Sequence, residues 1–348
     1  MIAYNFYTNL EEVKEDNEEF KTYLQMDQIM KKLFTINNPR PIIDLLNAIY
    51  ADNISYDAKL RYNDKEIINK ADESSKLIRF YADMYITVID GNNVYEYALE
   101  FQTIFDKEIA IRVFRYSFER AVKLADYSKS KECIKLKMPE PYIILIEEEE
   151  GVKDRIKLEI EFSKNAGFTY EIKILRYWTY GLEQLYKENM YLLYPLQIFK
   201  LRKNMKEISS SNRSQEIKES QMLQLYEELK GLIEKTLQAI DKAYEDGKID
   251  INDYDTMNTV IENLNSYFLN MYGKYRDLDK EVSDMVKSFY DPKVEEKGKE
   301  EGKIEGKKLV AKNMLLDGED VEKIKKYTGL SDEDINNIKR LIEGEGNH

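Results

Sequence analysis

A change of hydrophobic period near residue 76 constrains the fold of this chain more than any other feature. From Lys76 the segment LIRFYADMYITVI is rich in β-branched and aromatic residues, and VYEYALEFQT follows the turn residues 90–93. Two strand-like runs separated by a turn that contains Asp-Gly predict a β-hairpin. Helical spacing returns over residues 107–127, so the hairpin is followed by a helix.

Strand and helix patterns continue on both sides of the hairpin. After it, the apolar run PYIILIEEEEG and the segments RIKLEIEF and YEIKILRYW each predict a strand. Before it, helical spacing over residues 27–34 ends at the NPRP segment, and a second, strongly apolar helix follows. Strands and helices in this order predict an α/β core. Helix 107–127 places its apolar residues along one side, namely Ile111, Phe114, Phe118, Val122 and Ala125.

Composition changes at the serine-rich segment 209–212, which predicts a linker. The residues before it alternate between strand and helix patterns, whereas those after it are helical throughout. The expected division of the chain is a first domain over residues 1–207, a linker over 208–214, a helical region over 215–290, and a charged stretch with a helical pair over 291–348.

The scarcity of histidine and cysteine excludes several reaction classes. His348 and Cys133 are the only residues of their types in the sequence. Ser-His-Asp and Cys-His catalysis need an internal imidazole as the base, and structural zinc sites need several Cys or His ligands, so both are excluded. Catalysis must therefore depend on carboxylates, Lys, Tyr, amides and metal ions that bind oxygen. No glycine motif for binding phosphate occurs, so no nucleotide cofactor is expected.

The second strand of the hairpin carries the strongest candidate site. Glu96, Glu100 and Gln102 share one face of that strand, and Asp83 interrupts the apolar run of the strand before it. If the two strands pair through the turn at 90–93, Asp83 converges with Glu100. Two carboxylates and water are ligands that suit Mg²⁺. The alternative is that Glu96 and Glu100 lie on a solvent-exposed strand face, as alternating charges usually do.

These residues resemble the hallmark of a nuclease family. An Asp at position 83, the string Glu100-Phe101-Gln102 and a following helix with Arg112 and Tyr116 are similar to the pattern of the recombination-promoting nucleases, a transposase-like family of the PD-(D/E)XK nuclease superfamily. The segments DQIMKKLF, YLLYPLQIFKLRK and GKKLVAKNMLLDGEDVEKIKKYTGLSDEDI also resemble family segments, in the same order. The resemblance implies a restriction-endonuclease-like mixed sheet flanked by helices, followed by an all-helical C-terminal region.

The resemblance also implies a role for each matching residue. Asp83 and Glu100 would hold Mg²⁺, or Mn²⁺ in its place, together with the backbone carbonyl of Phe101. Gln102 would stand where many superfamily members have the Lys that orients the attacking water. The seventeen residues from Asp83 to Glu100 are a long separation for the family, which a longer hairpin or a different aspartate would explain. An accessory acid and two side chains that line the site complete the set: Asp27, Arg112 and Tyr116.

The chain is acidic as a whole, so contact with DNA requires a local basic patch. Its formal net charge is −13, which excludes a global positive field for holding nucleic acid. Four basic residues next to the linker are suited to phosphate contact and form a basic cluster without acids between them: Lys200, Arg202, Lys203 and Lys206. A solvated helix end explains the same residues equally well.

The C-terminal helical pair is expected to serve packing or oligomerisation. Gly329 ends its first helix, and residues 331–334 begin the second with a capping box. A helix-turn-helix is disfavoured, because the acidic start of the second helix is unfavourable beside a DNA groove. Two short helices cannot bury the apolar residues of this tail alone, so we expect the tail to take part in a homodimer.

Together these features favour a cytoplasmic, Mg²⁺-dependent DNA endonuclease, linked to recombination or transposition. No targeting segment and no membrane-spanning run are expected. Two alternatives stay open. The first is a catalytically silent relative that binds DNA or other proteins, which metal-dependent nicking of DNA would distinguish. The second is a purely structural helical scaffold, which a core without a mixed sheet would favour.

Overall fold

The computed structural model forms two compact units. One unit ends at Val286 and the other begins at Lys287, and helix α9 (Arg276–Leu316) runs through this boundary. The structure describes residues 32–34, 36–63, 66–69, 78–81, 84–125, 133–162, 166–272 and 276–345.

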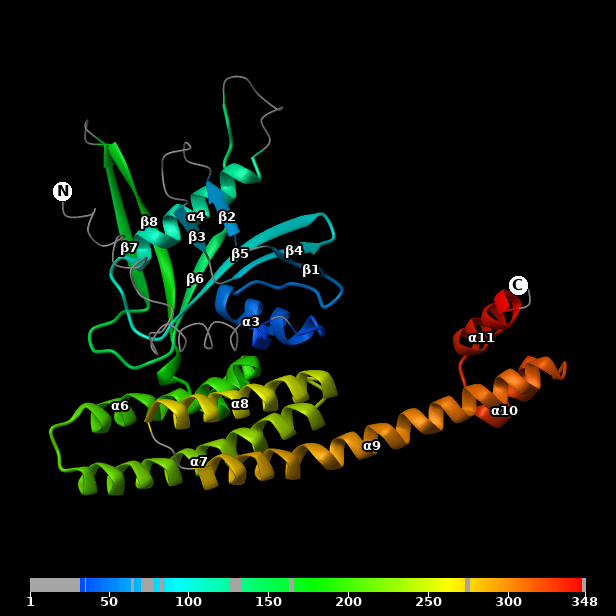
Figure 1. The fold of residues 1–348 in the computed structure, drawn as a ribbon. Helices are drawn as coiled ribbons and strands as arrows, with labels where there is room; N and C mark the ends of the chain where they lie inside the picture. Colours follow the sequence, from blue (N-terminus) through cyan, green and yellow to red (C-terminus); the bar gives the residue numbers. More distant parts are fainter. Residues whose placement is uncertain are drawn as a thin grey trace. The chain divides into compact units, whose positions relative to one another are not determined.

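A six-stranded mixed sheet lies at the centre of the first unit (Figure 1). The strands are ordered β1-β4-β5-β6-β8-β7, with β5, β6 and β8 parallel and the other pairs antiparallel. Their bounds are β1 Lys59–Asn63, β4 Met84–Asp90, β5 Asn93–Gln102, β6 Glu140–Leu145, β7 Arg155–Phe162 and β8 Ala166–Arg176. A second sheet pairs β2 (Glu66–Asn69) with β3 (Ile78–Tyr81). The mixed sheet confirms the predicted α/β fold class.

The predicted hairpin is the pair of β4 and β5. Asp90 pairs with Asn93 beside the turn, and the ladder extends to Met84 opposite Leu99. Gly91 at the turn has a φ of 57°, a left-handed conformation that glycine adopts without steric cost. The predicted strand RIKLEIEF coincides with β7, and the two other predicted strands overlap β6 and β8.

Helices cover both faces of β5. On one face, α3 (Arg40–Tyr50) places the ring of Tyr50 4.5 Å from that of Tyr97, and the Tyr50 hydroxyl donates to the Glu140 carbonyl over 3.0 Å. On the other face, α4 (Ile109–Lys123) packs its buried side against Tyr85, Ala98 and strand residues beyond them. Residues 97–100, which alternate between the two faces of β5, are therefore all buried.

Helix α4 buries a different side from the one that its apolar spacing predicts. Ile111 and Phe118, on the side that carries the apolar residues in the sequence pattern, are 50% and 42% exposed. The reason is that the helix faces a strand that carries carboxylates, so polar side chains turn inward to meet them. The buried side consists of Ile109, Ala110, Val113, Tyr116, Ser117, Arg120 and Ala121.

The acids of β5 do not lie on a solvent-exposed face. The side chains of Glu96 and Arg120 are each 8% exposed, and a guanidinium nitrogen lies 3.1 Å from a Glu96 carboxylate oxygen. The Thr87 hydroxyl donates to the other oxygen of Glu96 over 2.6 Å. Glu100 is 6% exposed. The alternative of a solvated strand face is therefore wrong.

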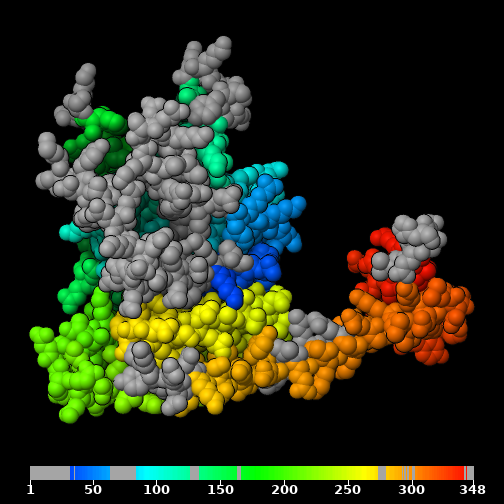
Figure 2. Space-filling view, viewed as in Figure 1, coloured from blue at the N-terminus to red at the C-terminus, as the bar shows by residue number. Residues whose placement is uncertain are grey.

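The rest of the first unit is helical and is organised around η2 (Tyr191–Leu201), a 3-10 helix in which residues 191–199 are all buried. Helices α6, α7 and α8 pack against η2 and against one another. In the space-filling view the α8 surface adjoins that of the α3 segment, where Asn38 donates to Asp253 over 2.6 Å (Figure 2). The predicted linker, 208–214, covers the end of α6 and the loop before α7, inside this unit. The remaining bounds are η1 Tyr177–Thr179, α5 Leu182–Lys187, α6 Arg202–Ser210, α7 Gln215–Glu245 and α8 Ile251–Tyr272.

The second unit contains three helical segments: the end of α9, α10 (Val321–Thr328) and α11 (Asp332–Glu345). The charged stretch between residues 293 and 308 is part of α9. No helix among the described residues is long and apolar enough to cross a membrane. Residues from all three segments form one buried cluster: Ala311, Ile324, Ile335 and Ile338.

The buried pair of Glu96 and Arg120 gives a test of how α4 is held on the sheet. We expect Arg120→Met to lower the free energy of unfolding by about 3 kcal/mol, because it leaves the Glu96 carboxylate buried without its cation. The double variant Arg120→Met/Glu96→Leu should recover most of this loss. Urea unfolding of the three proteins measures both effects. An exposed ion pair contributes less than about 1 kcal/mol to stability. A loss below this value for Arg120→Met would contradict the role of the buried pair in holding α4 on the sheet.

Candidate functional site

The carboxylate of Glu100 is the centre of the candidate site. Glu100 precedes the last two residues of β5, and its side chain lies on the α4 side of the sheet. The Tyr116 hydroxyl donates to one carboxylate oxygen over 3.1 Å, and the Gln102 amide donates to the other over 3.0 Å. Two donors on separate oxygens fix the orientation of the carboxylate. The structure therefore brings together Glu100, Gln102 and Tyr116, three of the site residues expected from the sequence.

Tyr116 is itself positioned by the neighbouring strand. The Tyr85 hydroxyl on β4 donates to the Tyr116 carbonyl over 2.9 Å, and the two rings meet edge to face at 6.1 Å. Burial raises the pKa of Tyr85 far above its ordinary value, so this hydroxyl remains a donor. The Arg120 guanidinium lies 5.4 Å from the centre of the Tyr85 ring. Contacts thus run continuously from the Glu96–Arg120 pair to Glu100.

The other predicted site residues are placed differently or lie outside the described residues. Phe101 packs its ring 4.5 Å from that of Phe34, on the face of β5 opposite Glu100. Arg112 is half-exposed and lies 3.6 Å from Asp106. Asp27 and Asp83 lie outside the described residues. The described ladder ends at Met84, which pairs with the neighbour of Glu100 on β5, Leu99.

The basic cluster does not form one surface. Lys200 donates to the Tyr180 carbonyl over 2.6 Å, and burial lowers its pKa. Arg202 is largely buried and forms an ion pair with Glu147, which is also buried. No acid lies between residues 200 and 206 in the sequence, but the fold brings Glu147 to Arg202 from the end of β6. Lys203 and Lys206 are left on the side of α6 that faces a cavity.

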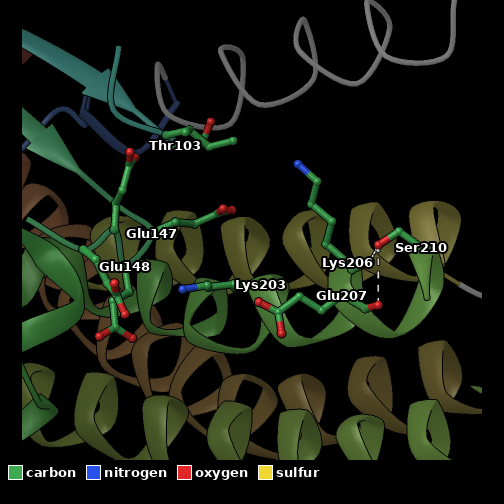
Figure 3. Close-up of a pocket in the computed structure, with 10 residues that line it drawn as sticks. Thr103, Glu147, Glu148, Lys203, Lys206, Glu207 and Ser210 are labelled. Carbon is green, nitrogen blue, oxygen red and sulfur yellow. Dashed lines mark hydrogen bonds between the residues drawn. The ribbon is translucent and has the colours of Figure 1, made fainter. Parts of the chain in front are cut away.

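This cavity, of about 320 Å³, lies where β5 and β6 end. Figure 3 shows Lys203 extending from α6 toward the glutamates that follow β6. The lining of the cavity begins next to Gln102 along the chain, at Thr103, and the Ile146 amide, one residue before the lining residue Glu147, donates to the Gln102 carbonyl over 2.9 Å. The acidic run 147–150 stands at the end of a segment that predicts a strand, and no role for it follows from the sequence pattern alone. Its position after a buried strand was the available signal, because ligand sites gather where parallel strands end.

The described residues contain no complete metal cluster. Across the described ranges, no group of three or more Asp, Glu, His or Cys side chains is arranged to hold a metal ion. At the candidate site they supply one carboxylate, that of Glu100, with an amide and a phenol beside it. Oxygen ligands of this kind match a hard cation such as Mg²⁺.

The second unit has the geometry of two helices joined by a tight turn. Gly329 ends α10 with a φ of 65°, and α11 begins three residues later. The Ser331 hydroxyl and the Asp334 carboxylate form the predicted capping box, in which the Asp334 amide donates to the serine over 3.2 Å and the serine donates to the carboxylate over 2.6 Å. This bond lowers the pKa of Asp334.

Two of the three acids at the start of α11 are engaged within the unit. Asp334 faces back to Ser331, and Asp332 lies 3.0 Å from the Lys325 ammonium on α10. Farther along the helix, Asn336, Asn337 and Arg340 are exposed. The exposed face of α11 is therefore not entirely acidic. It also presents amide and guanidinium groups.

Comparison with known proteins yields one match. No curated protein and no solved structure matches the chain. Residues 305–340 match the family model described as Rpn/YhgA-like nuclease family, C-terminal HTH domain. This match corrects the expectation that the terminal helical pair is not a helix-turn-helix. It also agrees with the resemblance to the recombination-promoting nuclease family, because residues 305–340 are similar to the C-terminal HTH domain of the Rpn/YhgA-like nucleases.

Proposed function

We propose that this protein is a metal-dependent DNA endonuclease that hydrolyses phosphodiester bonds. The observation that carries the proposal is the buried carboxylate of Glu100, held by Gln102 and Tyr116 beside the end of β5. A carboxylate with this little exposure is costly to bury unless it has a task or a partner. The match of the C-terminal part to a nuclease family supports the same function.

The residues of the site suit Mg²⁺, with Mn²⁺ as a substitute. Mg²⁺ is usually bound through one or two carboxylates and completes its shell with water. In this proposal Glu100 and Asp83 hold the ion, together with the Phe101 carbonyl. When bound, the ion supplies an activated water and neutralises charge that develops on the phosphate.

The protein side chains around Glu100 orient the reacting groups. Tyr116 and Gln102 hold the carboxylate in one rotamer, so no reorientation is needed when a cation binds. Gln102 does not titrate near neutral pH and therefore cannot take a proton from water. Its role in the proposal is to orient Glu100 and the attacking water, which leaves activation of that water to the metal. Arg112 and Asp27 remain proposed accessory residues.

Binding of duplex DNA is assigned to α11. Arg, Asn and Gln side chains are the common readers of base edges in the major groove, and Asn336, Asn337 and Arg340 are exposed on this helix. Phosphate contact by Lys203 and Lys206 is a further part of the proposal, because these two members of the basic cluster line the cavity beside the candidate site.

A homodimer through the second unit is also proposed. Leu309 and Leu316 are 60% and 61% exposed, whereas Ala311 on the same helix belongs to the buried cluster of this unit. They are seven residues apart on α9 and therefore lie on one side of that helix. Helix-turn-helix proteins commonly bind two half-sites of DNA as dimers. A second copy of this chain would supply the helix for the second half-site.

The first prediction concerns cleavage. Glu100→Gln and Asp83→Asn should each reduce Mg²⁺-dependent nicking of plasmid DNA by at least about a hundredfold, because each removes a charged ligand. EDTA should abolish the wild-type activity. Glu159→Gln, an exposed change on β7, is the control and should leave the rate unchanged. Wild-type rates in both site variants would contradict the assignment. DNA binding without cleavage by the wild-type protein would instead support a catalytically silent relative.

The second prediction concerns duplex binding. Asn336→Ala/Arg340→Ala should weaken binding to duplex DNA by about tenfold or more, because hydrogen bonding to each base edge is worth roughly 1–3 kcal/mol. Fluorescence anisotropy in EDTA measures binding without cleavage. The matched control is Asn313→Ala, an exposed asparagine on α9. Equal affinities for the double variant and the control would remove α11 from the interface.

The third prediction concerns the oligomer. Light scattering should give the mass of a dimer for the full chain and the mass of a monomer for Leu309→Glu/Leu316→Glu, because a buried carboxylate without a partner opposes association. A monomeric wild-type chain at tens of micromolar would contradict the homodimer.

A further inference from the structure

The outer side of α4 and the face of the β7–β8 hairpin beside it expose an unusual set of aromatic residues. Phe118 on α4 is 42% exposed, and Phe162 and Phe168 on the hairpin are 58% and 48% exposed. Phe114 joins them, with its ring 6.3 Å from Phe118 and 6.1 Å from Phe168. Figure 1 shows α4 beside β7 and β8, in agreement with these contacts. We call these four phenylalanines the aromatic strip.

The aromatic strip is a consequence of how α4 packs. The helix turns Tyr116 and Arg120 inward to meet Glu100 and Glu96, so the apolar residues of its other side remain in water. On the hairpin, Phe168 of β8 pairs with Ile160 of β7, so their side chains share one face of the hairpin. Phe162 lies two residues after Ile160 on β7 and therefore points to the same face. The hairpin face that packs against α4 therefore continues past the helix with aromatic side chains exposed.

Positive charge accompanies the aromatic strip. Helix α4 has four basic residues and one acidic residue, although the whole chain has a net charge of −13. Arg120 is buried, but Lys123 and Arg112, which lies 3.6 Å from Asp106, are exposed on the same helix as Phe118. Local positive charge within an acidic chain attracts a polyanion to this side of the protein.

We infer that the aromatic strip binds single-stranded DNA. Exposed rings stack on bases of any sequence, while neighbouring cations contact the phosphates, and these are the two components of single-strand recognition. A duplex buries its base faces in its own stack, so it gains little from such a surface. The inference rests on the proposed function and specifies its substrate class: single-stranded DNA held on the outer side of α4, the helix whose inner side carries Tyr116.

The test is direct binding of a labelled oligo-dT to the full chain in EDTA, so that no cleavage occurs. Phe118→Ala/Phe168→Ala should weaken binding of this oligonucleotide by about tenfold or more, since stacking on each ring is worth roughly 5-fold or more in affinity. Binding to a duplex of the same length should not change. Leu124→Ala is the matched control, because Leu124 is 48% exposed at the end of α4 but cannot stack on a base.

A second pair of variants keeps the test valid if the phenylalanine variant is poorly folded. Arg112→Gln/Lys123→Gln should reduce the salt dependence of oligo-dT binding, by a slope of roughly 0.7 for each phosphate that the protein no longer neutralises. Unchanged affinity in the phenylalanine variant, or an unchanged slope in the charge variant, would overturn the inference. So would conversion of a dimer to a monomer by Phe118→Ala/Phe168→Ala at unchanged affinity, which would assign the strip to a second copy.

These measurements are independent of catalysis. If the wild-type protein binds oligo-dT through the strip but does not nick DNA with Mg²⁺, the inference holds and the proposed function fails. If the wild-type protein nicks DNA but the phenylalanine variant binds oligo-dT normally, the proposed function holds and the inference fails.

Discussion

The burial of strand β5 on both faces is the constraint on which the first unit depends. Its α3 side is aromatic and packs as an ordinary core, but its α4 side carries Glu96 and Glu100. A buried carboxylate must be paired or hydrogen-bonded. Helix α4 supplies Arg120 to the first acid and Tyr116 to the second. The need to satisfy these acids, rather than apolar periodicity, determines which side of α4 faces the sheet, and it leaves the aromatic strip outside.

Local patterns in the sequence predict much of this fold. The turn around Gly91, the strand Arg155–Phe162 and the capping box at Ser331 depend on residues close together in the chain, and each is found as expected. The pairing of Glu100 with Gln102 also follows from strand alternation, because residues two apart share a face.

Interactions between segments that are distant in the sequence could not be predicted from local patterns. Lys200 and Arg202 look accessible in the sequence, but the fold supplies the Tyr180 carbonyl to one and Glu147 to the other. The acidic start of α11 looked unsuitable for DNA, but Asp332 is neutralised by Lys325 from the preceding helix. In each case, the charges near a residue in the sequence differ from the charges near it in the folded protein. Partners that lie far apart in the sequence are brought together only by folding.

We propose that recognition and chemistry lie in separate parts of one chain. The second unit contains the residues that are similar to the HTH domain of a nuclease family, and the first contains the carboxylate site proposed to cut. The most direct test of the central claim is a crystal structure of the protein soaked with Mn²⁺, with anomalous scattering used to locate the ion. We expect a Mn²⁺ ion bound to the Glu100 carboxylate and absent from Glu100→Gln crystals. Mn²⁺ bound elsewhere, with no ion at the Glu100 carboxylate, would contradict this assignment.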